Sequence, residues 1–332
     1  MKMTASNRRD IWIDSLRGFA AFGVMIVHIL GTFPNIGIKS SGTGKIFVCL
    51  FMFITGYYAF VDIETKYNIY QILHFYFKKF YTIVPQFIVC LFLGLFLKLY
   101  DYNTIISTLQ FKIGLMHFWY IPVVLGFYFT IPFFRMILHP LNNRQRIIAI
   151  TLIIILFEIL FPWYKSTENS IEFWWYIPCF LIGYLIRIVT IELSLNKHYS
   201  YDILSVICLI TFILIVPGVR EFLLGIPSDK YLQNKLVFMT FLWGLFCIFT
   251  LKSKYLFKFL NCKNLFSCYA KYGYSLYLIH FIILTYFMRR ELSGIHLLFF
   301  TSITSCIGAI ILYYIVQYPI IIIIRRIKNS KK

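Results

Sequence analysis

The chain has 332 residues, of which 60% are hydrophobic and only 14% are charged. A soluble domain carries about 25% charged residues, so this composition excludes an ordinary soluble protein. The formal net charge of +19 does not indicate nucleic-acid binding, because the basic residues lie in short loops between apolar runs and not on one patch. Basic loops of this kind orient a membrane protein and contact anionic lipid headgroups. We therefore expect a polytopic membrane protein.

The apolar runs predict an all-α membrane helix bundle with about ten transmembrane helices. The expected bounds are 11–33, 44–62, 81–99, 117–138, 147–163, 171–191, 203–219, 235–251, 273–289 and 296–324. The first run is too long for a signal peptide and lacks a small-residue cleavage site, so we expect it to be a span. Residues 1–332 then form one integral-membrane domain with short basic tails at 1–10 and 325–332. Lys and Arg are roughly twice as frequent in the loops on the side of the two ends, which predicts that both termini are cytoplasmic.

The first predicted helix carries two polar residues on one face. Arg17 and His28 are eleven positions apart, which at 100° per residue points both side chains in nearly the same direction. Along the helix axis they lie roughly 16 Å apart. An ionisable group at membrane depth is costly unless it faces a cavity or a partner. Either Arg17 reaches the headgroups while His28 donates one hydrogen bond to a neighbouring helix, or both belong to a polar track into the membrane.

The second and third spans carry further polar or small residues. Thr55 and Gly56 predict a close approach of another helix, either by packing alone or with a hydroxyl that bonds across the contact. Lys78 and Lys79 precede the third span at its cytoplasmic edge. This basic pair either anchors the helix or holds a phosphate-bearing ligand.

The fourth and fifth spans contain several candidate polar groups. His117 opens the fourth span beside Trp119, which is typical of an interfacial aromatic belt, and Tyr128 follows on the same helix. Glu158 lies within a wholly apolar run. An acid at that depth is either a functional residue or a neutral, hydrogen-bonded side chain.

The last two spans repeat the pattern of polar groups inside apolar helices. Tyr277 and His280 are three positions apart on one face, and Ser275 lies two positions before Tyr277. The final helix contains Gln317 and Pro319, and a proline within a membrane helix marks a kink or a lined cavity. The eight cysteines show no CxxC spacing, so we expect no zinc site and no disulfide framework, but buried thiols.

Four sequence elements together resemble the acyltransferase 3 family of integral-membrane acyltransferases, which modify bacterial surface polysaccharides. Residues 14–20 with His28 match its signature of an arginine, ten residues and a histidine. Residues 53–57, Phe-Ile-Thr-Gly-Tyr, resemble its Phe-x-Ile-Ser-Gly-Phe element, and residues 273–280 resemble its Ser-Tyr-x-x-Tyr-Leu-x-His element. Residues 317–319 resemble its Glu-x-Pro ending. The four elements follow the family's order and cover most of the chain.

Two positions depart from the family pattern. Thr82 stands where the family usually has an arginine, so Lys78 and Lys79 have to supply any cytoplasmic phosphate contact. Residues 125–128, Leu-Gly-Phe-Tyr, lack the glutamate of the family's Glu-x-Gln-Phe-Tyr element. Because we expect no fused extracytoplasmic hydrolase-like domain, the chain has to complete the transfer by itself.

The resemblance implies a multi-pass enzyme of the bacterial plasma membrane. It transfers acetyl from cytoplasmic acetyl-CoA, or another short acyl-CoA, to a hydroxyl of a cell-surface or exported polysaccharide or lipid-linked glycan. Arg17, Lys78 and Lys79 hold the donor, and His28 is the base or acyl-accepting group. The residues implied to line the chamber are Asp14, Tyr57, His117, Trp119, Tyr128, Glu158, Ser275, Tyr277, His280 and Gln317. No metal and no permanently bound cofactor are implied, while membrane lipids and polysaccharide biosynthesis proteins are implied as partners.

Two other classes of function fit the same residues. A transporter or flippase-like bundle that moves an acyl group or lipid-linked glycan without catalysis also uses intramembrane histidines and a kinked helix. A membrane scaffold for polysaccharide synthesis needs neither intramembrane histidines nor a kinked helix. If the chain is such a scaffold, Arg17 and His28 are expected to tolerate substitution. Release of free CoA in proportion to ester formed distinguishes a transferase from both.

Overall fold

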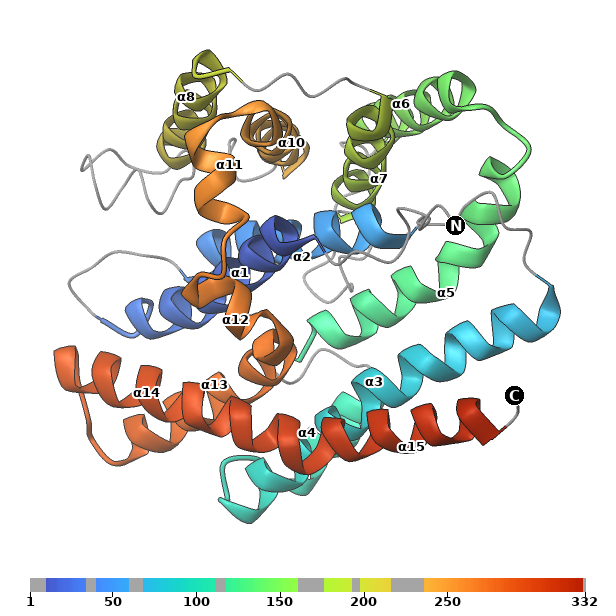
Figure 1. Ribbon diagram of the computed structural model, residues 1–332. Helices are drawn as coiled ribbons and strands as arrows, with labels where there is room; N and C mark the ends of the chain where they lie inside the picture. Colours follow the sequence, from blue (N-terminus) through green and yellow to red (C-terminus); the bar gives the residue numbers. More distant parts are fainter. Residues whose placement is uncertain are drawn as a thin grey trace.

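The computed structural model describes residues 10–33, 40–59, 68–110, 118–160, 176–192, 198–215 and 236–330, and every regular element within these ranges is helical (Figure 1). The longer helices are α1 (Ile11–Leu30), α2 (Ser40–Ala59), α3 (Ile69–Phe96), α5 (Tyr120–Leu138), α6 (Asn143–Leu160), α7 (Ile177–Glu192), α8 (Ser200–Ile215), α10 (Leu236–Lys252), α13 (Gly273–Arg289), α14 (Gly294–Leu312) and α15 (Tyr318–Ser330). The shorter ones are α4 (Tyr102–Leu109), α11 (Tyr255–Leu260), α12 (Leu265–Tyr269), η5 (Ala270–Tyr272) and η6 (Tyr313–Gln317).

Each predicted span overlaps a helix of the structure. Within the described ranges, 4 helical stretches are long and apolar enough to cross a membrane: Ile11–Leu30, Ile69–Phe96, Tyr120–Leu138 and Gly294–Ile324. Shorter apolar helices cover Phe47–Ala59, Ile177–Val189, Ser200–Thr211 and Leu242–Lys252. The all-helical class is therefore confirmed, while ten crossings and two cytoplasmic ends stay predictions.

The first long helix, α1, lies at the centre of the bundle (Figure 1). Trp12 and Leu16 on one face pack with apolar residues of α2, α7 and α10. Met25 and Ile29 on another face pack with α13 and α14. In its most apolar 18-residue stretch α1 has 61% of its residues buried, against 17% for Gly294–Ile324. Polar side chains on α1 therefore face protein and not lipid.

The contacts along α1 and α13 show that the two helices run in the same direction. Gly273 at the start of α13 lies against Arg17, and His280 further along lies against His28. By the same criterion α2 runs opposite to α1, and α5 runs opposite to α3. Arg17 and His28 therefore both face α13, as their spacing predicts.

The helix pattern changes just before Pro319, where the sequence predicted a kink or a lined cavity. The α-helical pattern of α14 changes to a π-helix over Tyr313–Gln317, and α15 follows at once. Proline has no N–H to donate to the preceding turn, and a π-turn accommodates that loss within a continuous helix. The same turn directs Gln317 inward, where it is buried.

Three short helices, α4, α11 and α12, were not predicted, and the stretch before α13 is not the simple basic loop that we expected. α4 follows Asp101, whose carboxylate accepts a hydrogen bond from the Thr104 N–H at 2.7 Å. α12 follows Asn264, which forms a reciprocal capping box with Ser267. An Asp or Asn followed three residues later by a polar residue is the sequence signal for these starts.

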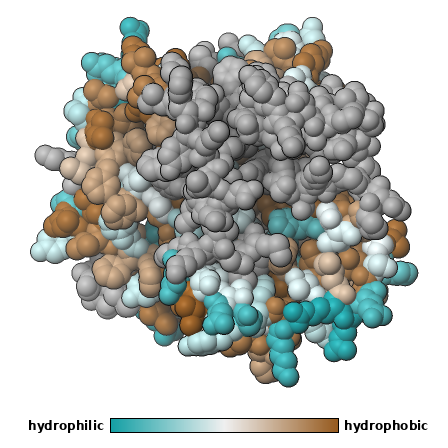
Figure 2. Space-filling view, turned by 180° about the vertical axis from the view of Figure 1, so that it is seen from behind, coloured by the Kyte–Doolittle hydropathy of each residue, from teal (hydrophilic) through white to brown (hydrophobic). Residues whose placement is uncertain are grey.

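Apolar side chains cover much of the described outer surface, as a membrane environment requires. Phe92 of α3, Phe129 of α5 and Ile315 of η6 are among the exposed residues. Figure 2 shows apolar residues along the left of the rear face and hydrophilic residues gathered toward its lower right. None of the eight cysteines, all within described ranges, forms a disulfide; Cys262 and Cys268 are exposed, contrary to the expectation of buried thiols.

Candidate active site

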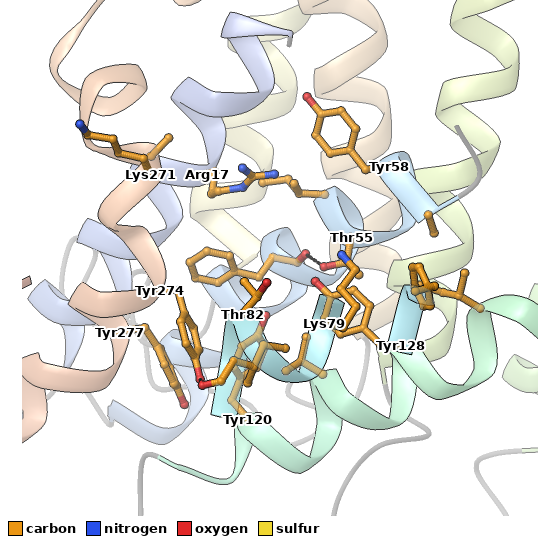
Figure 3. A pocket seen from close by; sticks show the side chains of 18 of the residues that line it. Arg17, Thr55, Tyr58, Lys79, Thr82, Tyr120, Tyr128, Lys271, Tyr274 and Tyr277 are labelled. Carbon is orange, nitrogen blue, oxygen red and sulfur yellow. Dashed lines mark hydrogen bonds between the residues drawn. The ribbon is translucent and has the colours of Figure 1, made fainter. Parts of the chain in front are cut away.

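A cavity of about 550 Å³ lies where α1, α2, α3, α5 and α13 meet (Figure 3). Four basic side chains line it: Arg17, Lys79, Arg135 and Lys271. Its polar and aromatic lining further includes Thr55, Tyr58, Thr82, Tyr120, Tyr128, Tyr274 and Tyr277. The volume falls within the range of about 300–1,000 Å³ typical of small-molecule sites. No acidic side chain is among the described residues that line the cavity, so it suits an anionic ligand.

Arg17 is held at the cavity by its neighbours on α1 and α2. Its Nη1 lies 3.3 Å from Oδ1 of buried Asp14, one turn earlier. The guanidinium also lies 5.7 Å from the centre of the Tyr58 ring, a cation–π distance. The Arg17 side chain is 33% exposed, so the guanidinium remains accessible to a ligand. Asp14, predicted as a lining residue, orients Arg17 from behind.

Lys79 and Lys78, predicted as a donor-binding pair, have different positions. The Lys79 ammonium lies 4.0 Å from the centre of the Tyr128 ring and 5.6 Å from that of Phe75, inside the cavity. Lys78, next to it on α3, is not among the described lining residues. Neighbours on an α-helix diverge by about 100°, so only one of them faces the site. The predicted Tyr128 is confirmed as part of the lining.

Arg135 and Lys271 were not predicted as site residues, because a basic residue near a helix end usually anchors that end at the membrane surface. Arg135 is buried in the last turn of α5. It shares a stripe with Tyr128 and Ile131, which line the same cavity; this i, i+3, i+7 spacing is the signal that identifies it. Lys271 lies 4.5 Å from the Tyr272 ring centre. A hydrogen bond to Tyr272 raises the pKa of Lys271 above its ordinary value, which favours the charged ammonium.

The two membrane histidines form a pair. The rings of His28 and His280 are 5.2 Å apart between centroids and nearly perpendicular at 88°. Phe281, which follows His280 on α13, also contacts the His28 ring, with ring centroids 5.6 Å apart. Nδ1 of His280 lies 3.0 Å from the Leu276 carbonyl oxygen. Because a carbonyl only accepts, Nδ1 is the donor, and Nε2 of neutral His280 is an acceptor.

The histidine pair lies next to the cavity and not in its wall. Neither histidine is among the described residues that line it, whereas Tyr277 and Tyr120 are. The Tyr277 ring is 6.0 Å from that of His280 and 5.0 Å from that of Tyr120. His280 and Tyr277 were expected to share one chamber, but only Tyr277 lines the cavity, and its ring lies between the cavity and His280.

Two predicted lining residues belong to a buried polar network. The hydroxyl of Ser275 donates to Oε1 of Gln86 at 2.5 Å, and Nε2 of Gln86 donates to Oε1 of Gln317 at 2.7 Å. All three side chains are buried. The network joins α13, α3 and η6 directly behind the cavity. Gln86 was not identified from the sequence, because a single glutamine in an apolar helix has no periodic signature.

Tyr57 and Trp119, two other predicted residues, are not among the described residues that line the cavity. Tyr57 is buried, and its hydroxyl accepts a hydrogen bond from Arg187 at 3.0 Å, outside the described cavity lining. Trp119 stacks on Tyr176 with ring centroids 5.8 Å apart. His117 lies outside the described residues, and the side chain of Glu158 is not described. Among the residues that the structure describes, no group of three or more metal-ligating side chains is close enough to hold a metal ion.

Comparison with known families gives one match. The family model of the acyltransferase 3 domain, described as an acyltransferase domain, matches residues 10–327. This range includes α1 and the candidate site residues that the structure describes. No curated protein and no solved structure matches the chain.

Proposed function

The chain belongs to the acyltransferase 3 family, and from this premise we propose that it is a membrane O-acyltransferase. The proposed donor is acetyl-CoA or another short acyl-CoA from the cytoplasm. The proposed acceptor is a hydroxyl of a cell-surface or exported polysaccharide, or of its lipid-linked precursor, at the bacterial plasma membrane. The observation that supports this best is a cavity lined by four cations beside the His28–His280 pair, with Arg17 and His28 on the same central helix, α1.

The cations suit the phosphate groups of a CoA donor. Arg17 and Arg135 offer planar guanidinium groups, which bind phosphate oxygens in a bidentate manner, while Lys79 and Lys271 add point charges. The four side chains come from α1, α3, α5 and η5, so a single ligand can bridge four separate elements. Several aromatic rings in the lining offer apolar surface for the less polar parts of the donor.

The histidine pair suits the chemistry of ester formation. In the proposed step, the acceptor oxygen attacks the thioester carbonyl carbon, the new C–O bond forms, and the C–S bond breaks. His28 takes the hydroxyl proton and returns it to the leaving sulfur, so CoA leaves as a thiol. A hydroxyl needs such a base within hydrogen-bond reach. Arg17 and His28 are roughly 16 Å apart along α1, which allows a long, thin donor to bind by its phosphates at one and react at the other.

The test is release of CoA by membranes that contain the chain and the glycans of the producing cell. His28→Ala is expected to lower CoA release and the ester content of the glycan by at least roughly 100-fold. Arg17→Ala is expected to lower the same two quantities by at least roughly tenfold. The matched controls are His296→Ala and Arg290→Ala, because both side chains are exposed and outside the described cavity. Normal ester formation in His28→Ala would remove His28 from the mechanism. Glycan export without any CoA release would instead support the transporter.

A further inference from the structure

We propose that Tyr120 and Tyr277 form a constriction between the cavity and the histidine pair, and that its width determines which acyl groups reach His28. This inference rests on the proposed acyl-CoA-dependent function. It concerns the acyl group, which neither the cations nor the histidines specify.

A continuous series of ring contacts supports the constriction. Phe51 contacts Tyr120 with ring centroids 6.0 Å apart, and Tyr120 contacts Tyr277 at 5.0 Å. Tyr277 contacts His280 at 6.0 Å, and His280 contacts His28 at 5.2 Å. The first three rings line the cavity, and the two histidines do not. A group bound in the cavity therefore meets the tyrosines before it meets His28.

The two tyrosines are packed closely enough to close the path. Both are buried, with 6% of Tyr120 and 4% of Tyr277 exposed. At a centroid separation of 5.0 Å and an angle of 59°, the rings are in contact. Figure 3 shows both at the lower end of the cavity, away from Arg17 and Lys271. One ring has to move before an acyl group passes.

Tyr120 is the ring that is better placed to move. It is the first residue of α5 and directly follows the turn residues Phe118 and Trp119. A preceding helical turn restricts the side-chain rotamers of a residue within a helix, and a residue at the start of a helix is less restricted. Tyr277 lies within α13, where the preceding turn is complete and supports the Leu276 carbonyl that orients His280.

Selection by width follows from the shape of the donor. The acyl group enters the constriction first, and the CoA arm follows it. Next to the sulfur, this arm is an unbranched chain. An unbranched acyl group is no wider than that arm and passes wherever the arm passes. An acyl group that branches beside the carbonyl is wider, so the two tyrosine rings exclude it. The wild-type protein is therefore expected to use acetyl-CoA and to reject isobutyryl-CoA.

The experiment compares CoA release from acetyl-CoA and isobutyryl-CoA by membranes of the producing cells that carry each variant at equal abundance. Membranes without the chain give the background rate. Tyr120→Ala is expected to raise the isobutyryl-to-acetyl ratio of kcat/KM at least roughly tenfold, as expected for relief of a steric exclusion. Tyr120→Phe, which keeps the ring, is expected to keep the wild-type ratio. If Tyr120→Ala does not accumulate in the membrane, Tyr120→Leu takes its place in the comparison.

The outcomes separate the two proposals. If the wild-type chain releases CoA and the alanine and leucine variants keep its acyl preference, the constriction is wrong while the transferase stands. The same holds if Tyr120→Phe shifts the ratio as strongly as Tyr120→Ala, because the ring then does not set the width. If the wild-type chain releases no CoA above background from either donor, the transferase itself is wrong.

Discussion

Gly56 of α2 and Gly183 of α7 face each other where the two helices cross, and each leaves room for the backbone of the other helix. A Cβ atom on Gly56 would overlap the Phe180 carbonyl oxygen, and one on Gly183 would overlap that of Phe53. The crossing lies next to Thr55, which lines the cavity. The close approach expected from Thr55 and Gly56 in the sequence is confirmed, with packing as its basis.

Alanine at either glycine is expected to separate α2 from α7. Gly56→Ala and Gly183→Ala should each lower the free energy of unfolding by about 1–3 kcal/mol, because the contacted atoms are backbone and cannot rotate away. The measurement is the thermal unfolding midpoint of the detergent-solubilised protein. Gly244→Ala is the matched control, since its Cβ would meet side-chain atoms only, of Ile182 at 3.1 Å and of Ile186 at 3.5 Å. Equal midpoints for all three variants would contradict the close crossing.

Gln86 connects two other polar groups, so its replacement affects more than one hydrogen bond. Gln86→Leu should destabilise the protein by about 1–3 kcal/mol, because Ser275 and Gln317 lose a partner in a buried setting. Gln110→Leu is the control at the exposed end of α4. The check is again the unfolding midpoint. If Gln86→Leu lowers the unfolding midpoint no more than Gln110→Leu does, the network does not stabilise the protein.

The adjacent lysines of α3 provide a direct test of which face binds the donor. Lys79→Ala should raise KM for the acyl-CoA by about 10- to 100-fold, the effect of removing one charge-assisted hydrogen bond. Lys78→Ala should change KM far less, because that side chain is not among the described residues of the cavity wall. Steady-state kinetics with varied donor give both values. The reverse order of effects would place the donor on the other face of α3.

His280 is expected to act through His28 and not on the donor directly. His280→Asn should keep a donor toward the Leu276 carbonyl but remove the ring against His28. A misplaced catalytic group costs up to about 100-fold in rate, so kcat should fall while KM stays near its normal value. Comparison with His280→Ala, measured by kcat and KM together, completes the test. A rise in KM alone would mean that His280 contacts the donor instead.

The sequence predicted the helices well and the cavity only in part. Apolar length and the spacing of Arg17 and His28 were enough to identify α1 and its polar face, because helical periodicity is a local property. Arg135 and Lys271 were not predicted because basic residues near helix ends usually serve as anchors. Only the packing of α5 against α2 and α3, and of η5 against α1, turns these two inward. The π-turn before Pro319 was predicted as a kink, since proline disrupts a helix in any context.

The separation of the cavity from the histidines could not be predicted. It depends on Tyr120 and Tyr277, which are 157 positions apart in the sequence and belong to helices that meet only in the folded bundle. A tyrosine in a membrane segment is typical of many interfaces, so residue type alone carried no signal. The same is true of Gln86, whose two partners come from distant parts of the chain.

The central position of α1 has a consequence for how the protein is made. α1 is synthesised before α13, the helix that contacts it beside both Arg17 and His28 and begins more than 250 residues after α1 begins. At about 5–20 residues per second, α1 waits for roughly 13–50 seconds before α13 is synthesised. During that interval α2, α7, α10, α11 and α12 become available to it, but the face with Arg17 and His28 has not met α13. The central helix of the bundle therefore reaches its native environment long after its own synthesis.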